Sequence, residues 1–206
     1  MVAGCDLAPQ FFKRIERFAS TLAVWGARTN LTAHPDDPAE VAFHIIDSLA
    51  PLFAVPSPAL LRERAGVRVL DLGSGAGFPG LILAAATIDA QFTLVEARRK
   101  RASFLSVAAI EMELTNVTVR SARASAATVE TGVDIATSRA VGEAGFEIAA
   151  RALKTNGAAV LWANADQTIN LDRAHRAGLV ESGRYEYAVN RTDAVARRIL
   201  IILQKQ

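Results

Sequence analysis

Apolar residues near the start of the chain recur at helical spacing. They follow one another at steps of four and three, and they are Phe11, Ile15, Phe18, Leu22 and Trp25. Residues at these steps lie on one face of a helix. Most of the charged residues between them face away, so the pattern predicts an amphipathic helix that packs on a core.

A second helix is predicted from its start. Asp37 can cap the first turn, Pro38 suits the first helical position, and Glu40 completes a capping box. We expect this helix to run to about Phe53. The three prolines between residues 51 and 58 mark its end and a linker.

From Val67 onward, short strand-like runs alternate with helix-like stretches. The runs rich in β-branched and apolar residues are Val67–Leu72, Gln91–Glu96, Asn116–Arg120, Val133–Ser138 and Gly157–Ala163. The helix-like stretches between them are Pro79–Thr87, Arg98–Glu113, Ser121–Val129 and Glu143–Leu153. This alternation is typical of crossover units, and it predicts a parallel sheet with helices on both faces.

The end of the chain departs from this alternation. Ser182–Val189 and Arg197–Gln204 are two strand-like runs joined by a short polar loop. They predict a hairpin that adds an antiparallel C-terminal strand to a mostly parallel, seven-stranded α/β sheet of Rossmann-like type. We expect residues 1–60 to form a helical extension on the core of residues 61–206, within one structural domain.

Composition sets limits on this picture. The 206 residues are 51% hydrophobic and 21% charged, which suits one globular domain and excludes disorder. The apolar run Leu72–Ile88 contains four glycines and a proline, so no membrane span is expected. Asp6 interrupts the start before an apolar stretch develops, so we expect no N-terminal leader, and the lone Cys5 cannot form an internal disulfide. We expect a cytoplasmic monomer.

Charge adds one observation about partners. The formal net charge is +2, and the cations are 19 Arg and 4 Lys. Arginine binds phosphate through a bidentate fork, so this excess is compatible with nucleic acid. On this feature alone, codon usage in a GC-rich genome is the better explanation.

The strongest motif is the glycine-rich loop that follows the first strand. Gly75, Gly77 and Gly80 match the G-x-G-x-x-G pattern of nicotinamide enzymes. Asp71 and Gly73 extend it to D-x-G-x-G-x-G, which is instead typical of S-adenosylmethionine-dependent methyltransferases. In either case, glycines let a ligand lie directly on backbone N–H groups.

A second carboxylate supports a nucleoside-containing ligand. Glu96 ends the next strand, where it can accept hydrogen bonds from both ribose hydroxyls. Both cofactors carry a ribose, so Glu96 does not separate them. The antiparallel last strand does, because it is typical of class I methyltransferases and unusual in the dinucleotide sheet.

The absence of certain residues disfavours two kinds of methylation reaction. Cys5 is the only cysteine and lies far from the glycine loop, which disfavours a cysteine nucleophile for methylation at carbon. After the fourth strand, Thr137–Ala140 replaces the Asn/Asp-Pro-Pro-aromatic motif of exocyclic amino methylation. A nucleophile with a free lone pair, such as guanine N7, needs no catalytic base.

Cations follow Glu96 and end the fourth strand. The first group is Arg98, Arg99, Lys100 and Arg101, which are candidate phosphate contacts or a solvated helix end. Arg139 is a candidate for holding the cofactor carboxylate or a substrate phosphate, with a structural ion pair as the alternative. Asp47 and Ser48 lie three and four residues after His44, on one face of the second helix. This group is either a functional patch or a polar flank of the helix. The three histidines give a metal site little support.

Several segments together resemble one known family. They are Asn30-Leu31-Thr32, His44-Ile45-Ile46-Asp47-Ser48-Leu49, Asp71–Gly80, Lys100-Arg101, Phe104-Leu105, Ser138-Arg139-Ala140 and Leu153-Lys154. Over residues 20 to 203 the chain resembles the glucose-inhibited division protein B family. These are the small-subunit ribosomal RNA methyltransferases G, which form 7-methylguanosine in 16S RNA.

The resemblance implies a cofactor, a substrate and site residues. The cofactor is S-adenosyl-L-methionine, and the partner is 16S rRNA or the 30S subunit. The family's cofactor contacts correspond to Gly73, Phe78, Ala124, Ser125 and Arg139 of this chain. Asp71, Gly75 and Glu96 are expected to bind the cofactor as well. The cationic run and His44 are the expected RNA contacts. No metal and no general base are expected.

This chain departs from the family pattern at four positions. Ser125 stands where the family commonly has an acid, and Phe43 where it often has arginine. Ala163 and Asn164 replace Lys-Gly. The departures at Phe43, Ala163 and Asn164 leave open an RNA-binding ribosome-assembly factor that keeps the fold with weak catalysis. The G-x-G-x-x-G match and Glu96 leave open an NAD-dependent oxidoreductase.

Overall fold

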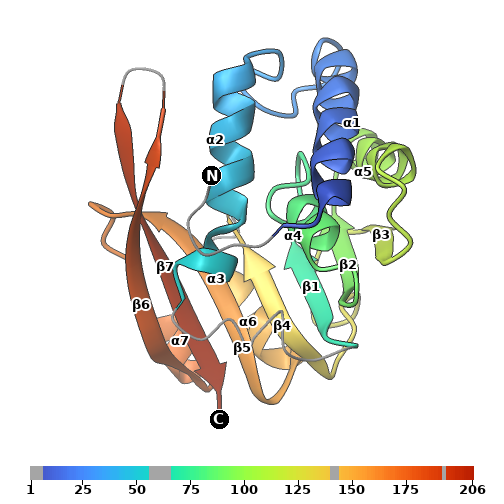
Figure 1. Cartoon of the computed structure of the whole chain (residues 1–206). Coiled ribbons are helices and arrows are strands. Elements are labelled where there is room, and N and C mark those ends of the chain that lie inside the picture. Colours follow the sequence, from blue (N-terminus) through green and yellow to red (C-terminus); the bar gives the residue numbers. More distant parts are fainter. Residues whose placement is uncertain (1–6, 56–65, 140–143, 192–193) are drawn as a thin grey trace.

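One sheet of seven strands organises the molecule. The computed structural model describes residues 7–55, 66–139, 144–191 and 194–206. The strand order is β3-β2-β1-β4-β5-β7-β6. The strands are β1 (Arg68–Leu72), β2 (Gln91–Glu96), β3 (Val117–Ser121), β4 (Val133–Ser138), β5 (Leu153–Asn164), β6 (Leu179–Asn190) and β7 (Val195–Lys205). Strands β1 to β5 pair in parallel, whereas β7 runs antiparallel to β5 and β6, as predicted (Figure 1).

Helices cover both faces of this sheet, which confirms the prediction made from the alternation of strands and helices. They are α1 (Pro9–Gly26), α2 (Pro38–Ser48), α3 (Ala50–Phe53), α4 (Gly80–Ala86), α5 (Arg99–Glu111), α6 (Ala144–Ala152) and α7 (Asp172–Arg176). One core cluster packs the first five helices against one face of the sheet. A second cluster packs α6 and α7 against the opposite face. None of the helices in the described ranges is long and apolar enough to cross a membrane.

The second predicted helix ends earlier than expected. Asp37 Oδ1 accepts hydrogen bonds from the backbone N–H groups of Ala39 and Glu40, so the cap is confirmed. The helix stops at Ser48, and α3 follows as a separate turn. Pro51 explains the break, because proline has no N–H to donate to the carbonyl four residues earlier. The Glu40 carboxylate pairs with Arg191 instead of closing the capping box.

The predicted helix over Ser121–Val129 is wrong. These residues form the end of β3 and then an irregular turn. Thr128 Oγ1 accepts from the Ser125 N–H at 2.9 Å and donates to the Arg123 carbonyl at 2.7 Å. Serine and threonine side chains that bond to nearby backbone groups compete with helical hydrogen bonds, and here they replace them.

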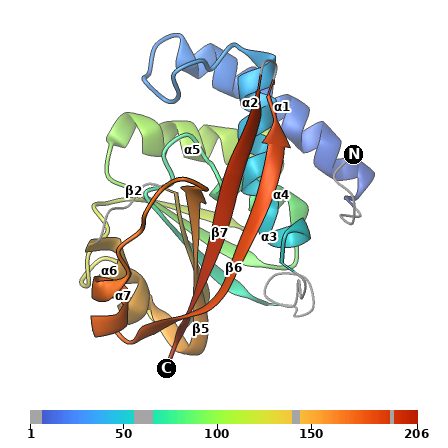
Figure 2. The same cartoon turned by 90° about the vertical axis from the view of Figure 1, so that its left-hand side faces the viewer.

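The β6–β7 hairpin stands beside α2 in both ribbon views (Figure 2). Arg191, near its tip, lies 4.9 Å from the centre of the Phe43 ring and pairs with Glu40. The hairpin therefore ties the N-terminal helices to the far edge of the sheet.

Several predictions lie outside the described residues: Cys5, the boundary between residues 60 and 61, Ala140, Glu143 and the hairpin loop at 192–193.

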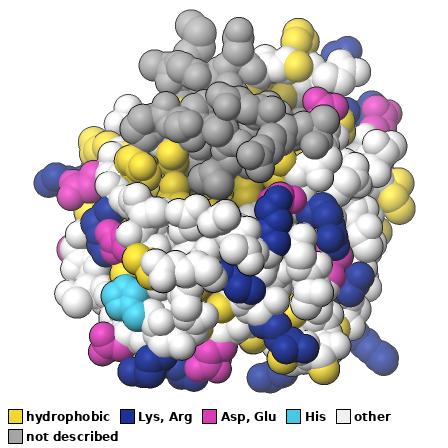
Figure 3. All heavy atoms as spheres, turned by 90° about the horizontal axis from the view of Figure 1, so that it is seen from below, with side chains coloured by type: hydrophobic (Ala, Val, Ile, Leu, Met, Phe, Trp, Pro, Cys, Tyr) yellow, Lys and Arg dark blue, Asp and Glu magenta, His cyan; other side chains and the backbone are white. Residues whose placement is uncertain are grey.

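The amino edge of the sheet carries charges of both signs. Figure 3 views the molecule from below and shows Lys and Arg side chains next to Asp and Glu. At the strand starts, Arg68 pairs with Glu130, and Lys154 pairs with Asp134. Because these cations have partners, this edge is a poor candidate for binding a polyanion.

Candidate functional site

The glycine loop leaves β1 at the carboxyl edge of the sheet. Gly73, Gly75 and Gly77 have φ angles of 72°, 56° and 88°, in the left-handed region that favours glycine. A Cβ on Gly77 would lie 2.7 Å from Leu81 Cδ1, whereas one on Gly75 would meet no atom closer than 3.7 Å. A side chain at residue 77 would therefore clash with Leu81, whereas a Cβ at residue 75 would meet its neighbours at ordinary van der Waals distance.

Asp71 lies beneath this loop and is fully buried. Thr137 Oγ1 donates to its Oδ1 at 2.7 Å, and Oδ2 has no hydrogen-bond partner within the described residues. Burial raises the pKa of Asp71 from 3.8 to about 6, against the lowering effect of the Thr137 hydrogen bond. A Cβ on Gly80 would lie 2.6 Å from Oδ2, so Asp71 also requires glycine at the start of α4.

Glu96 links the glycine loop to the start of α5. Its Oε2 accepts from the Gly75 N–H at 3.0 Å, and its Oε1 accepts from the Arg98 N–H at 2.7 Å. The side chain is buried, with 6% of the residue exposed. Each carboxylate oxygen has a second lone pair, so Glu96 can hold the loop and still accept from a ligand. It also places a negative charge at a helix start that carries four cations.

Arg139 follows the last residue of β4 and reaches to α2. Its Nη2 lies 2.7 Å from Asp47 Oδ2, and the Arg139 side chain is 16% exposed. Its Nη1 lies 3.5 Å from Ser48 Oγ, and its guanidinium is 5.9 Å from the centre of the Phe78 ring. The ion pair foreseen as an alternative exists, at the strand end where ligands bind in open sheets.

His44 completes this group and is held in one protonation state. Its Nδ1 lies 3.3 Å from Arg139 Nη2. Arginine only donates, so Nδ1 accepts and the ring proton resides on Nε2. Burial, aided by the charge of Arg139, lowers the pKa of His44 to about 4. The centre of the half-buried imidazole ring lies 5.1 Å from the centre of the Phe78 ring.

The cationic run divides into two kinds of residue. Arg98, Arg99 and Lys100 are exposed at the start of α5. Arg101 is half-buried and donates from Nε and Nη2 to the Asn30 carbonyl, at 3.2 and 2.6 Å. Three members of the run therefore face solvent, and the fourth braces the segment between α1 and α2.

The remaining predicted contacts lie in the turn after β3 and at the end of β5. Ala124 packs against the second core cluster, and Ser125 is half-buried in the turn. Asn164 ends β5 and accepts a hydrogen bond from Arg198. Sequence reasoning missed Arg198, although it alternates with Leu200 and Ile202 on a core-facing side of an apolar strand.

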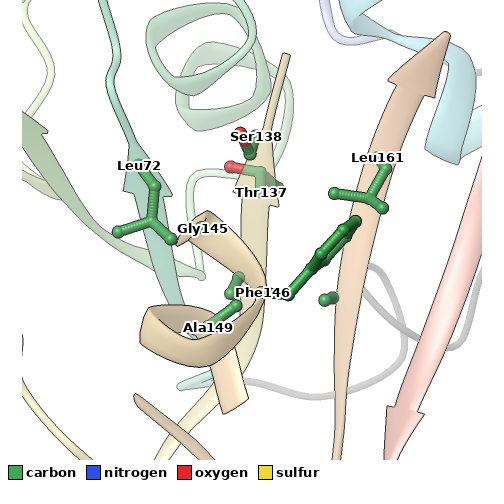
Figure 4. Close-up of a pocket in the computed structure, with 9 residues that line it drawn as sticks. Leu72, Thr137, Ser138, Gly145, Phe146, Ala149 and Leu161 are labelled. Carbon is green, nitrogen blue, oxygen red and sulfur yellow. The ribbon is translucent and has the colours of Figure 1, made fainter. Parts of the chain in front are cut away.

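A small apolar pocket lies on the other face of the sheet, between β4, β5 and α6 (Figure 4). Phe146 of α6 points toward Leu161, and Leu72, Thr137 and Ser138 complete the wall near the strand ends. The lining contains no charged side chain. The pocket offers hydrophobic contact and no acid–base chemistry.

Comparison with known proteins gives a family match. The family model for rRNA small subunit methyltransferase G matches residues 12–200. A ribosomal RNA small subunit methyltransferase G from Wolinella succinogenes is 41% identical over 64% of this chain and 63% of the relative. One from Methylobacillus flagellatus is 36% identical over 68% of this chain and 64% of the relative. The match thus spans just under two thirds of these relatives' lengths.

A solved structure shares the fold. M. jannaschii TYW2 in complex with AdoMet aligns with a TM-score of 0.57 over 80% of this chain and 76% of that chain. The sequence identity is 13%, so this similarity concerns the fold alone.

Proposed function

Because this chain belongs to the rRNA small subunit methyltransferase G family, we propose that it transfers the methyl group of S-adenosyl-L-methionine to N7 of a guanine in 16S rRNA. The observation that carries the proposal is the glycine loop that follows Asp71 and is tied to Glu96. The proposed substrate is the RNA, alone or within the 30S subunit. The enzyme acts as a monomer in the cytoplasm.

The loop fits the cofactor. A Cβ on Gly75 would meet Gly73 O only at 3.7 Å, so a ligand can approach the loop backbone there, and Glu96 keeps lone pairs for the ribose hydroxyls. Gly73 lies two residues earlier in the same loop. The Phe78 ring packs against His44, so the backbone of Phe78 would be the part that contacts the ligand, and Ala124 and Ser125 would contact the adenine. When bound, S-adenosylmethionine supplies a methyl group on a positively charged sulfur.

The protein then has to align guanine N7 with the methyl group of the cofactor. Guanine N7 has a free lone pair, so no side chain removes a proton before attack. Arg139 donates to an anionic or carbonyl partner: the cofactor carboxylate, an RNA phosphate or guanine O6. It thereby orients the reacting atoms, because correct placement lowers the barrier of an in-line displacement.

The RNA backbone is bound at the start of α5. Arg98, Arg99 and Lys100 contact phosphate, and Arg101 supports them from its place on Asn30. His44 acts near the base as a neutral donor. The family often has arginine at the position of Phe43 and lysine at that of Ala163. Arg191 lies over the Phe43 ring, and Arg198 donates to Asn164, the residue after Ala163, so these arginines keep positive charge near both positions.

The test is incubation with S-adenosylmethionine and unmodified 30S particles, followed by mapping of 7-methylguanosine. A modified guanine in 16S RNA is expected, and methyl transfer only to protein or small molecules would refute the proposal. RNA binding without turnover would favour the assembly-factor alternative. Titration with NAD(H) and S-adenosylhomocysteine separates the oxidoreductase alternative, and only the latter is expected to bind.

A further inference from the structure

Asp47 of α2 is fully buried and surrounded by donors. Arg139 Nη2 lies 2.7 Å from its Oδ2. Arg198 approaches with Nε at 3.0 Å from Oδ1 and Nη2 at 3.3 Å from Oδ2. Tyr187 donates its hydroxyl to Oδ1 at 2.6 Å. Both carboxylate oxygens are therefore engaged by side chains from three other segments.

The backbone of Asp47 is fixed as well. Its carbonyl accepts from Trp162 Nε1 at 2.8 Å. Pro51, four residues later, has no N–H, so the carbonyl is left to the indole. Strands β5, β6 and β7 thus hold this one residue through Trp162, Tyr187 and Arg198.

Charge pairing explains how the Asp47 carboxylate can be buried. A buried carboxylate is costly unless it is paired and hydrogen-bonded. Asp47 meets two guanidinium groups, Arg139 and Arg198, so these three side chains together carry one excess positive charge. Arg139 can therefore stay paired with Asp47 and still attract an anionic or carbonyl group.

The orientation of Arg139 depends on α2. Its backbone lies one residue beyond β4, where the strand ladder no longer fixes it. The groups that contact its guanidinium on α2 are Asp47, His44 and Ser48, which share one helical face. Of these, Asp47 is the charged partner at the shortest distance.

We propose that Asp47 is a positioning residue, which holds the Arg139 guanidinium at the carboxyl edge of the sheet for methyl transfer. Asp47 is 0% exposed, so it acts through Arg139 and does not touch the substrate. This role rests on the proposed function. It also gives the segment around His44 and Asp47 a task in turnover.

The test compares two variants that each remove one link to the same carboxylate. Asp47→Asn leaves an oxygen for Tyr187 or Arg198 and opposes Arg139 with an amide. Tyr187→Phe removes a different hydrogen bond and leaves the Arg139 pair intact. At saturating 30S substrate, D47N should lower kcat by roughly 10- to 100-fold with little change in KM. Y187F should keep kcat near wild type, even where both variants lose similar Tm.

A double-mutant cycle identifies the route. The D47N/R139A protein should be no slower than R139A alone, because both changes remove the same function. Equal losses of kcat in D47N and Y187F, or additive losses in the double variant, would overturn the proposal. If D47N does not fold, Asp47→Glu moves the charge by one methylene, and it should lower kcat in wild type but not in R139A.

A readout without substrate separates this inference from the proposed function. In ¹⁵N NMR of the whole protein, the Arg139 guanidinium signals should show hindered rotation in wild type and Y187F and free rotation in D47N. Absence of methylation by wild type would refute the proposed function and leave this result readable. Unchanged Arg139 signals in D47N would refute the positioning role.

Discussion

The buried acid beneath the glycine loop makes stability depend on pH in an unusual direction. Burial raises the pKa of Asp71 from 3.8 to about 6, so the folded protein favours the neutral carboxyl. Between those two values the folded state binds more protons than the unfolded state. Stability from this group is therefore full below 3.8 and is lost as pH rises toward 6. Asp71→Asn removes the titration and keeps an oxygen for the Thr137 hydroxyl.

The size of the effect follows from the pKa difference. Each pH unit corresponds to about 1.4 kcal/mol, so a rise from 3.8 to about 6 amounts to about 3 kcal/mol. Relative to wild type, D71N should gain about this much unfolding free energy between pH 4 and pH 8. The pKa of His44, lowered to about 4, gives the opposite slope between about 4 and 6.5. It is common to both proteins and cancels in the difference.

The assay is urea unfolding of the ligand-free protein at half-unit steps from pH 4 to pH 8. Asp166→Asn is the matched control, because Asp166 is exposed in the loop after β5, and its difference from wild type should stay small throughout. A difference between D71N and wild type that stays flat over this range would refute the reasoning. So would a D71N protein that becomes relatively less stable as pH rises.

Five further predictions address the loop and the cations near it. Gly80→Ala should lower unfolding free energy by about 1–3 kcal/mol in urea titrations, because its Cβ would lie 2.6 Å from a buried carboxylate oxygen. Gly73→Asp should abolish S-adenosylhomocysteine binding in calorimetry, and unchanged affinity would remove Gly73 from the site. Glu96→Ala should weaken that ligand by roughly 1.5–3 kcal/mol. The loss should be smaller for an analogue without ribose hydroxyls, and an equal loss would assign Glu96 to the loop alone. Neutralising residues 98–100 should flatten the salt dependence of RNA binding. Arg139→Ala should instead lower turnover at saturating RNA, and a change in the salt slope alone would move Arg139 to the outer surface.

The sequence by itself determined the order of the elements and the position of the loop. Strand and helix periods are local, so a parallel sheet with an antiparallel last strand could be predicted without contacts. The register of Asp71 before the glycines and Glu96 at the next strand end placed both acids at one edge. Local competition was harder to foresee: Thr128 replaced a predicted helix with a turn, and Pro51 divided another.

Only the tertiary structure decided which partner each polar side chain takes. Periodicity tells which face of a helix is buried, and it does not tell what lies opposite. Asp47 therefore reads as a polar flank in sequence, although Arg139, Arg198 and Tyr187 converge on it from three segments. In the same way, Arg101 belongs to a cationic run in sequence and to the Asn30 carbonyl in space. A charge acquires its role from the groups that folding brings within a few ångströms, and those groups lie far away along the chain.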